Sequence, residues 1–140
     1  MKLIYLLFLC LFVQTVRSQC AVKIERISST DFFVGRDSDS YYDSNYIGLK
    51  ITTNSSTSLE DCWVTLSLPS TQTLQLAPLE TGIFRIGAMN ASTSQNAYFL
   101  LTGRVEGLNY YTATVYQSYP LFNETLCSTT FNTSISQIIK

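Results

Sequence analysis

The sequence contains no histidine at all. Without an imidazole, a Ser-His-Asp or Cys-His catalytic arrangement and every histidine-containing zinc site are excluded. The four cysteines lie far apart, so they form neither a Cys₄ zinc site nor a C-x-x-C redox pair. The six glycines are scattered singly, which argues against a glycine-rich phosphate loop. These absences predict a protein that is not an enzyme.

Charge is also sparse, because Asp, Glu, Lys and Arg together make up 14% of the chain. Lys and Arg do not gather in a basic stripe, which disfavours a nucleic-acid partner. Patterns typical of helices are nearly missing as well. Alanine is scarce, and no window sustains the apolar spacing of an amphipathic helix.

The N-terminus has the three-part plan of a secretory signal peptide. Lys2 supplies the positive charge, residues 3–13 form an unbroken apolar run, and Val16 and Ser18 fit the specificity of a signal peptidase. The run is too short to span a membrane, which takes about 20 apolar residues. We therefore expect residues 1–18 to be cleaved, leaving residues 19–140 as a single secreted or cell-surface domain without a membrane span.

Cleavage changes the charge and the chemistry near the new terminus. The loss of Lys2 and Arg17 reduces nine basic residues to seven against ten acidic ones, a net charge of about −3. Cys20 then lies almost at the terminus. A lipid-modified Cys20 is an alternative, but Arg17 and Gln19 fit the small-residue requirement of lipoprotein signals poorly.

The exported chain keeps Cys20, Cys62 and Cys127. An oxidising compartment favours one disulfide over three free thiols. We predict the pair Cys62–Cys127, because both cysteines lie in apolar stretches that are typical of strands. Cys20 would then be free for an intermolecular disulfide. The alternative is that Cys20 ties the first strand to one of the others.

Four asparagines match the N-glycosylation pattern, which acts only in a eukaryotic or viral product. In such a product, several of them would carry sugar and lie on the surface. They are Asn54, Asn90, Asn123 and Asn132.

Apolar and polar residues alternate with period two along most of the exported chain, which predicts strands. The clearest alternations lie within 46–51, 62–68 and 110–116. Weaker strands are predicted at 21–28, 31–35, 73–77, 82–86, 97–105, 126–131 and 134–139. With turn residues between them, about seven to nine strands predict an all-β, antiparallel β-sandwich of the immunoglobulin-like type.

Three short motifs carry a resemblance to a known family. They are Leu49-Lys-Ile-Thr-Thr-Asn54-Ser55, Val64-Thr-Leu-Ser-Leu-Pro69 and Ile86-Gly87, followed by the strand-like stretches Tyr98-Phe-Leu-Leu101 and Ala113-Thr-Val-Tyr116. Over about residues 45–120 the chain resembles the immunoglobulin-like "conserved repeat" modules of bacterial surface proteins and adhesins. A signal peptide followed at once by Gln19 is similar to exported proteins of the Bacteroidetes group. The resemblance implies a non-catalytic module for adhesion, binding or spacing.

The chain departs from antibody domains at one point. Trp63 follows Cys62 directly, whereas antibody domains separate their first core cysteine from the core tryptophan by a strand and a turn. An antibody-style core is therefore not expected.

Two polar segments are candidate binding sites. Asp37, Asp39 and Asp43 offer oxygen ligands that suit Ca²⁺, although the central glycine and closing glutamate of an EF-hand are missing. A solvated loop is the alternative. Tyr41, Tyr42 and Tyr46 lie beside the same loop, and tyrosine near serine and asparagine is typical of adaptable binding surfaces.

Three functions remain open. The first is a secreted or cell-surface module that meets a protein or glycan partner without catalysis. The second is a free-standing secreted glycoprotein, of viral or parasite type, that binds a host protein. The least favoured is a secreted glycoside hydrolase, which needs two convergent carboxylates that the pattern of ten acidic residues does not mark.

Overall fold

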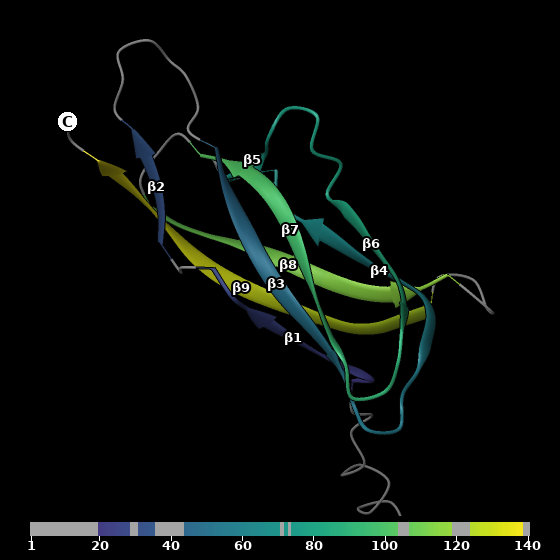
Figure 1. The fold of residues 1–140 in the computed structure, drawn as a ribbon. Helices are drawn as coiled ribbons and strands as arrows, with labels where there is room; N and C mark the ends of the chain where they lie inside the picture. Colours follow the sequence, from purple (N-terminus) through teal and green to yellow (C-terminus); the bar gives the residue numbers. More distant parts are fainter. Residues whose placement is uncertain are drawn as a thin grey trace, which may run out of the picture.

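The computed structural model describes residues 20–28, 31–35, 44–70, 72, 74–103, 107–118 and 124–138. Within these ranges the chain forms two stacked β-sheets and no helix (Figure 1). Sheet A contains β1 (Val22–Arg26), β3 (Ser44–Thr53), β7 (Ser94–Thr102) and β5 (Gln75–Leu76) in that spatial order. Sheet B contains β2 (Asp31–Gly35), β9 (Glu124–Ile138), β8 (Gly107–Gln117), β4 (Leu59–Ser67) and β6 (Ile83–Met89). The predicted all-β sandwich is confirmed.

The strand order is that of an immunoglobulin-like domain. The sequences β1-β3-β7-β5 and β9-β8-β4-β6 correspond to the A-B-E-D and G-F-C-C′ sheets of that fold. All neighbouring strands are antiparallel except β2, which pairs with β9 in parallel. Position D differs, because it is filled by the two-residue β5, which precedes β6 in the chain.

Most predicted strands lie where the structure has them. The range 31–35 is matched as predicted, and the other ranges differ at their ends by a few residues. The exception is the C-terminal segment, for which two strands were predicted, at 126–131 and 134–139. It is one strand, β9, because Thr133 continues the pairing with β8 opposite Asn109.

Period-two alternation places one face of every central strand in the core. Along β4, Cys62, Val64 and Leu66 are buried, while the residues between them face outward. The same alternation buries Tyr111, Ala113 and Val115 of β8. Sheet A contributes the fully buried side chains Leu49, Ile51, Phe99 and Leu101. Trp63 therefore lies on the outer face of sheet B, which agrees with the expected departure from an antibody core.

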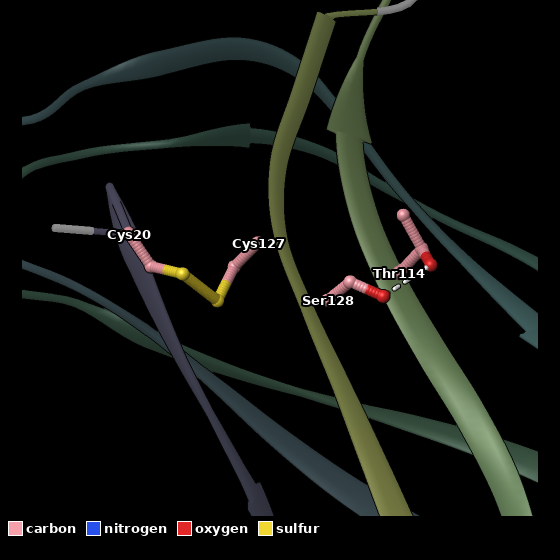
Figure 2. The surroundings of a disulfide bond; sticks show 4 residues. All are labelled: Cys20, Thr114, Cys127 and Ser128. Atoms are coloured by element: carbon pink, nitrogen blue, oxygen red, sulfur yellow. Dashed lines mark hydrogen bonds between the residues drawn. A yellow bond between two sulfur atoms is a disulfide. The ribbon is translucent and has the colours of Figure 1, made fainter. Parts of the chain in front are cut away.

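A disulfide joins Cys20, just before β1, to Cys127 in β9 (Figure 2). It therefore links the first strand of sheet A to a strand of sheet B, with 5.0 Å between the two Cα atoms. Figure 2 also shows the neighbouring hydrogen bond of 3.0 Å between the hydroxyls of Thr114 and Ser128, which ties β8 to β9.

The predicted pair Cys62–Cys127 is wrong, and the sheet order explains why. Cys62 in β4 and Cys127 in β9 lie in one sheet with β8 between them. Two strand spacings separate their backbones by about 9–10 Å, whereas a disulfide needs Cα atoms within about 7 Å. Cys62 is a buried free thiol, and burial followed by the charge of Asp61 raises its pKa to about 11. Cys20 is bonded within the chain, so the predicted intermolecular disulfide through Cys20 is wrong as well.

Candidate functional site

The predicted binding tyrosines fall into two groups. Tyr41 and Tyr42 lie outside the described residues. Tyr46 lies in β3, and its side chain is 68% exposed on the outer face of sheet A. Exposing a large aromatic ring to water is energetically unfavourable. The Tyr46 side chain is therefore a candidate for contact with a binding partner.

Two further apolar side chains lie on the same face and meet over Gly48. Gly48 stands opposite Tyr98 in β7, and its carbonyl accepts a hydrogen bond of 3.0 Å from the amide of Ile27. A methyl group placed on Gly48 would lie 2.7 Å from Cγ1 of Ile27 and 3.1 Å from Cε1 of Tyr98. The missing side chain at Gly48 is therefore what allows Ile27 and Tyr98 to close over the strand.

We call Ile27, Tyr46 and Tyr98 the tyrosine patch. Ile27 is 45% exposed and Tyr98 is 47% exposed. Tyr46 lies two residues from Gly48 on the same face of β3 and opposite Leu100, which is half-buried. The strands β3 and β7 and the residue that follows β1 thus contribute to one exposed apolar surface.

Polar residues bound the patch toward the other end of sheet A. Lys50 stands opposite Asn96 in β7 and beside Glu25 in β1. Glu25 forms an ion pair of 2.7 Å with Lys23, whose hydrogen bond and charge lower the pKa of the Glu25 carboxyl. The arrangement is an apolar centre with a charged border, which is typical of protein interfaces.

Leu79 is a further exposed apolar residue, in the turn that follows β5. It occupies the third position of a turn that is closed by a 2.9 Å hydrogen bond from Glu80 N to Ala77 O. Leu79 has φ of +72°, a conformation that normally selects glycine, and its side chain is fully exposed. Burial within the domain does not explain why a bulky residue is held in this strained conformation. Leu79 is therefore a candidate for contact with another molecule.

The outer face of sheet B carries a different cluster. The Trp63 ring of β4 lies parallel to the Tyr116 ring of β8, with 6.4 Å between centroids. The Arg85 guanidinium from β6 lies over the Trp63 ring, 5.4 Å from its centroid. Asp61 accepts hydrogen bonds of 2.9 Å from Arg85 Nε and 3.0 Å from Trp63 Nε1.

This second cluster is self-contained. Asp61 also accepts a hydrogen bond from the hydroxyl of Ser118, and the three hydrogen bonds, that of Ser118 first, lower the pKa of Asp61 to about 2. The main groups of the cluster thus pair with one another across β6, β4, β8 and the residue that follows β8. We interpret the cluster as a brace of sheet B, whereas the side chains of the tyrosine patch are left exposed.

The remaining predicted site residues are placed as follows. Asp37, Asp39 and Asp43 lie outside the described residues, so the Ca²⁺ site stays a prediction. Within the described ranges, no three His, Cys, Asp or Glu side chains gather where they could hold a metal ion. Asn54, Asn90 and Asn132 are exposed, and Asn123 lies outside the described residues.

The sequence identified Tyr46 but missed Ile27, Gly48 and Tyr98. Tyr98 was placed in a predicted strand without a role. Its partners come from β3 and from the residue that follows β1, so only the strand order of sheet A brings the patch together. The period-two alternation within 46–51 places Tyr46, Gly48 and Lys50 on one face, but it does not show which strands lie beside that face.

The chain was compared with known proteins, and solved structures with a similar fold were found. No protein-family model and no curated protein matches the chain. A cohesin module from a Clostridium perfringens family 33 glycoside hydrolase is similar with a TM-score of 0.46 and 11% identity, covering 86% of this chain and 100% of that one. A PapD-like domain of human CEP192 has a TM-score of 0.44 and 13% identity, covering 89% and 92%. SSP-19, an MSP-domain protein of Caenorhabditis elegans, has a TM-score of 0.40 and 12% identity, covering 68% and 87%.

These values are too low to carry an argument about function. The immunoglobulin-like assignment rests instead on the strand order of the two sheets. In the part of the chain that the structure describes, no helix has the length and apolarity that a membrane crossing requires.

Proposed function

We propose that this chain is a secreted or cell-surface β-sandwich module that binds a protein partner without catalysis, through the tyrosine patch. The observation that carries the proposal is the exposed cluster of Ile27, Tyr46 and Tyr98 over Gly48. Aromatic side chains provide large contact areas at a low entropic cost, which is why they dominate the energetic centres of protein interfaces.

The chemistry of the patch favours a protein over a glycan. Its centre combines two phenol rings with the aliphatic side chain of Ile27. Tyr98 receives one weak hydrogen bond, of 3.4 Å, from Asn96. A sugar needs several hydrogen-bonding groups around an open ring face, whereas an apolar protein surface needs shape and area.

The export signal and the disulfide support the location. Residues 1–18 have the plan of a signal peptide, and a disulfide such as Cys20–Cys127 persists in oxidising compartments. The finer proposal is that the domain is a module of the bacterial surface-repeat type, which its three motifs resemble. The lack of histidine supports the non-catalytic role.

The second candidate, a free-standing glycoprotein that binds a host protein, is favoured by the placement of three sequons. Asn54 and Asn90 lie at one end of the sandwich, where Ser92 N donates a 2.8 Å hydrogen bond to Asn54 O. Asn132 stands opposite Tyr110 on the other sheet. Tyr46 is about 27 Å from Asn54 along β3, at about 3.4 Å per residue, so sugars there would leave the patch open. Intact-mass analysis of the native protein decides between the two candidates.

A photo-crosslinking experiment tests the proposed surface. A benzoylphenylalanine replaces Tyr46, Tyr98 or Tyr110 in separate variants, and each is irradiated with the producing cells. Tyr110 is the matched control, because it is 48% exposed but lies in sheet B. We expect one protein adduct from positions 46 and 98 and none from position 110. Adducts from position 110 alone would overturn the proposed surface.

A further inference from the structure

The outer edge of β7 is only partly covered. β5 pairs with β7 at Thr102 and Leu101, and Ala77 N donates a 2.9 Å hydrogen bond to Leu100 O (Figure 1). Along an antiparallel strand, the N–H and C=O groups of successive residues point to opposite edges. Because the backbone groups of Leu100 point to this edge, those of every second residue before it do so as well. The even-numbered residues Ser94, Asn96 and Tyr98 also direct their N–H and C=O groups toward it.

The pairing of this segment with the edge of β7 ends at Leu100, where the side chain of Glu80 takes the place of a strand. Its Oε2 accepts a 3.0 Å hydrogen bond from Leu100 N, in place of a strand carbonyl, and its Oε1 accepts one of 3.2 Å from Gly82 N. The chain then crosses to sheet B, where Gly82 O receives the amide of Leu66 at 2.8 Å. Among the described residues, none pairs with the edge of β7 at Ser94, Asn96 or Tyr98.

Partly buried apolar side chains gather on this side of the core. Six apolar side chains that pack on the core are only partly buried, and four of them lie on β6, β5 or the segment after β4: Leu68, Leu76, Phe84 and Ile86. Phe84 contacts Phe99 of β7 edge-on at 6.3 Å, which places the core-facing side of β6 beside β7. An open groove of about 260 Å³ continues along β5, lined by Leu68, Pro69, Ser70, Leu74, Gln75 and Leu76.

We propose that the free edge of β7 accepts an extended strand from another protein chain. The incoming strand runs antiparallel to β7, in line with β5, and fills the D position that β5 occupies with only two residues. Its backbone pairs with Asn96 and Tyr98, and its inward-facing side chains are apolar, because they cover Phe84 and Ile86. Main-chain pairing of this kind supplies affinity, and the alternating side chains supply specificity.

A foreign strand fits this edge better than β7 of a second copy. The inward-facing residues Ala97 and Phe99 of such a strand are already fully buried in their own core. They cannot also cover Phe84 and Ile86. The occupant is therefore a segment that is extended or disordered before it binds, with alternating apolar residues. This inference does not depend on the tyrosine patch.

The test uses a soluble peptide of about ten residues that alternates Val and Thr between terminal lysines, added to residues 19–140. Amide hydrogen exchange is followed by NMR. We expect exchange at Asn96 and Tyr98 to slow by about tenfold or more at saturation. We expect Asn96→Pro, which removes an edge N–H that the fold does not use, to weaken binding by about tenfold. Asn96→Ala keeps that N–H and is the matched control, with binding unchanged.

A second arm keeps the test decisive if Asn96→Pro fails to fold. The same peptide is then N-methylated on its threonines, whose N–H groups face β7 when the valines point inward. It is added to the unaltered protein and is expected not to bind. Unchanged binding of the methylated peptide, or protection confined to other amides, would overturn the proposal. So would dimerisation of the free protein through Asn96 and Tyr98. Tyr46→Ser is expected to leave peptide binding intact, which separates this proposal from the tyrosine patch.

Discussion

Removing the disulfide is expected to cost this domain a large part of its stability. The bond Cys20–Cys127 closes a segment with a sequence separation of 107 residues. In the chain-entropy model, a loop of that length contributes about 4.8 kcal/mol at 25 °C, while measured disulfides typically contribute about 2–4 kcal/mol. Single domains are stable by only about 5–15 kcal/mol. A loss of about 4 kcal/mol through Cys20→Ser would therefore remove from about a quarter to most of the free energy of unfolding.

Urea unfolding of residues 19–140 measures this effect. At an m-value of about 1.5–2 kcal/mol/M, a loss of about 4 kcal/mol lowers the midpoint by about 2–3 M. Cys62→Ala is the control, because it removes a buried thiol that is not bonded, at a cost of about 1 kcal/mol. The reasoning is refuted if Cys62→Ala abolishes the disulfide, or if Cys20→Ser unfolds at the midpoint of the parent.

Three further predictions follow from single side chains. Replacing Leu79 by Gly relieves a positive φ and should stabilise the domain by up to about 1 kcal/mol in thermal unfolding; a clear loss of stability would show that the turn is not strained. Because the folded-state pKa of Asp61 is about 2, below its ordinary value of 3.8, its stabilising effect is complete above about pH 4 and is lost as the pH falls through 2. Asp61→Asn should therefore make the free energy of unfolding depend less on pH below about pH 4. An unchanged pH dependence in that range would contradict the hydrogen-bonded carboxylate. Gly48→Ala inserts a methyl group 2.7 Å from the Ile27 side chain and should weaken partner binding while leaving the fold intact by circular dichroism; unchanged affinity would show that Ile27 and Tyr98 need not meet.

Much of the fold could be predicted from local pattern, because alternation reports directly which side of a strand is buried. The strands around Leu49, Val64 and Ala113 were identified in this way. The continuation of β9 through Thr133 was missed, since a polar residue there looked like a break. Its burial reflects pairing with Asn109 of β8, which only the tertiary structure provides.

Long-range placement could not be predicted in the same way. Cys62 and Cys127 both lie in apolar strands, but the sequence does not show that β8 separates them. The tyrosine patch depends likewise on β1, β3 and β7 being neighbours, and on the absence of a side chain at Gly48. The sequence could name Tyr46 as a candidate because its position beside a polar loop is a local property; the side chain is exposed, and its role in binding stays a prediction.

The central claim is that the tyrosine patch binds the partner, and the dissociation constant tests it most directly. The protein captured by crosslinking at position 46 is purified, and its affinity is measured for the parent domain, for Tyr46→Ser/Tyr98→Ser and for Tyr110→Ser. We expect the double variant to bind at least about a hundredfold more weakly, since energetic centres of interfaces lose about 2 kcal/mol or more on truncation, and Tyr110→Ser to bind like the parent. An unchanged affinity of the double variant, or an equal loss in Tyr110→Ser, would contradict the claim.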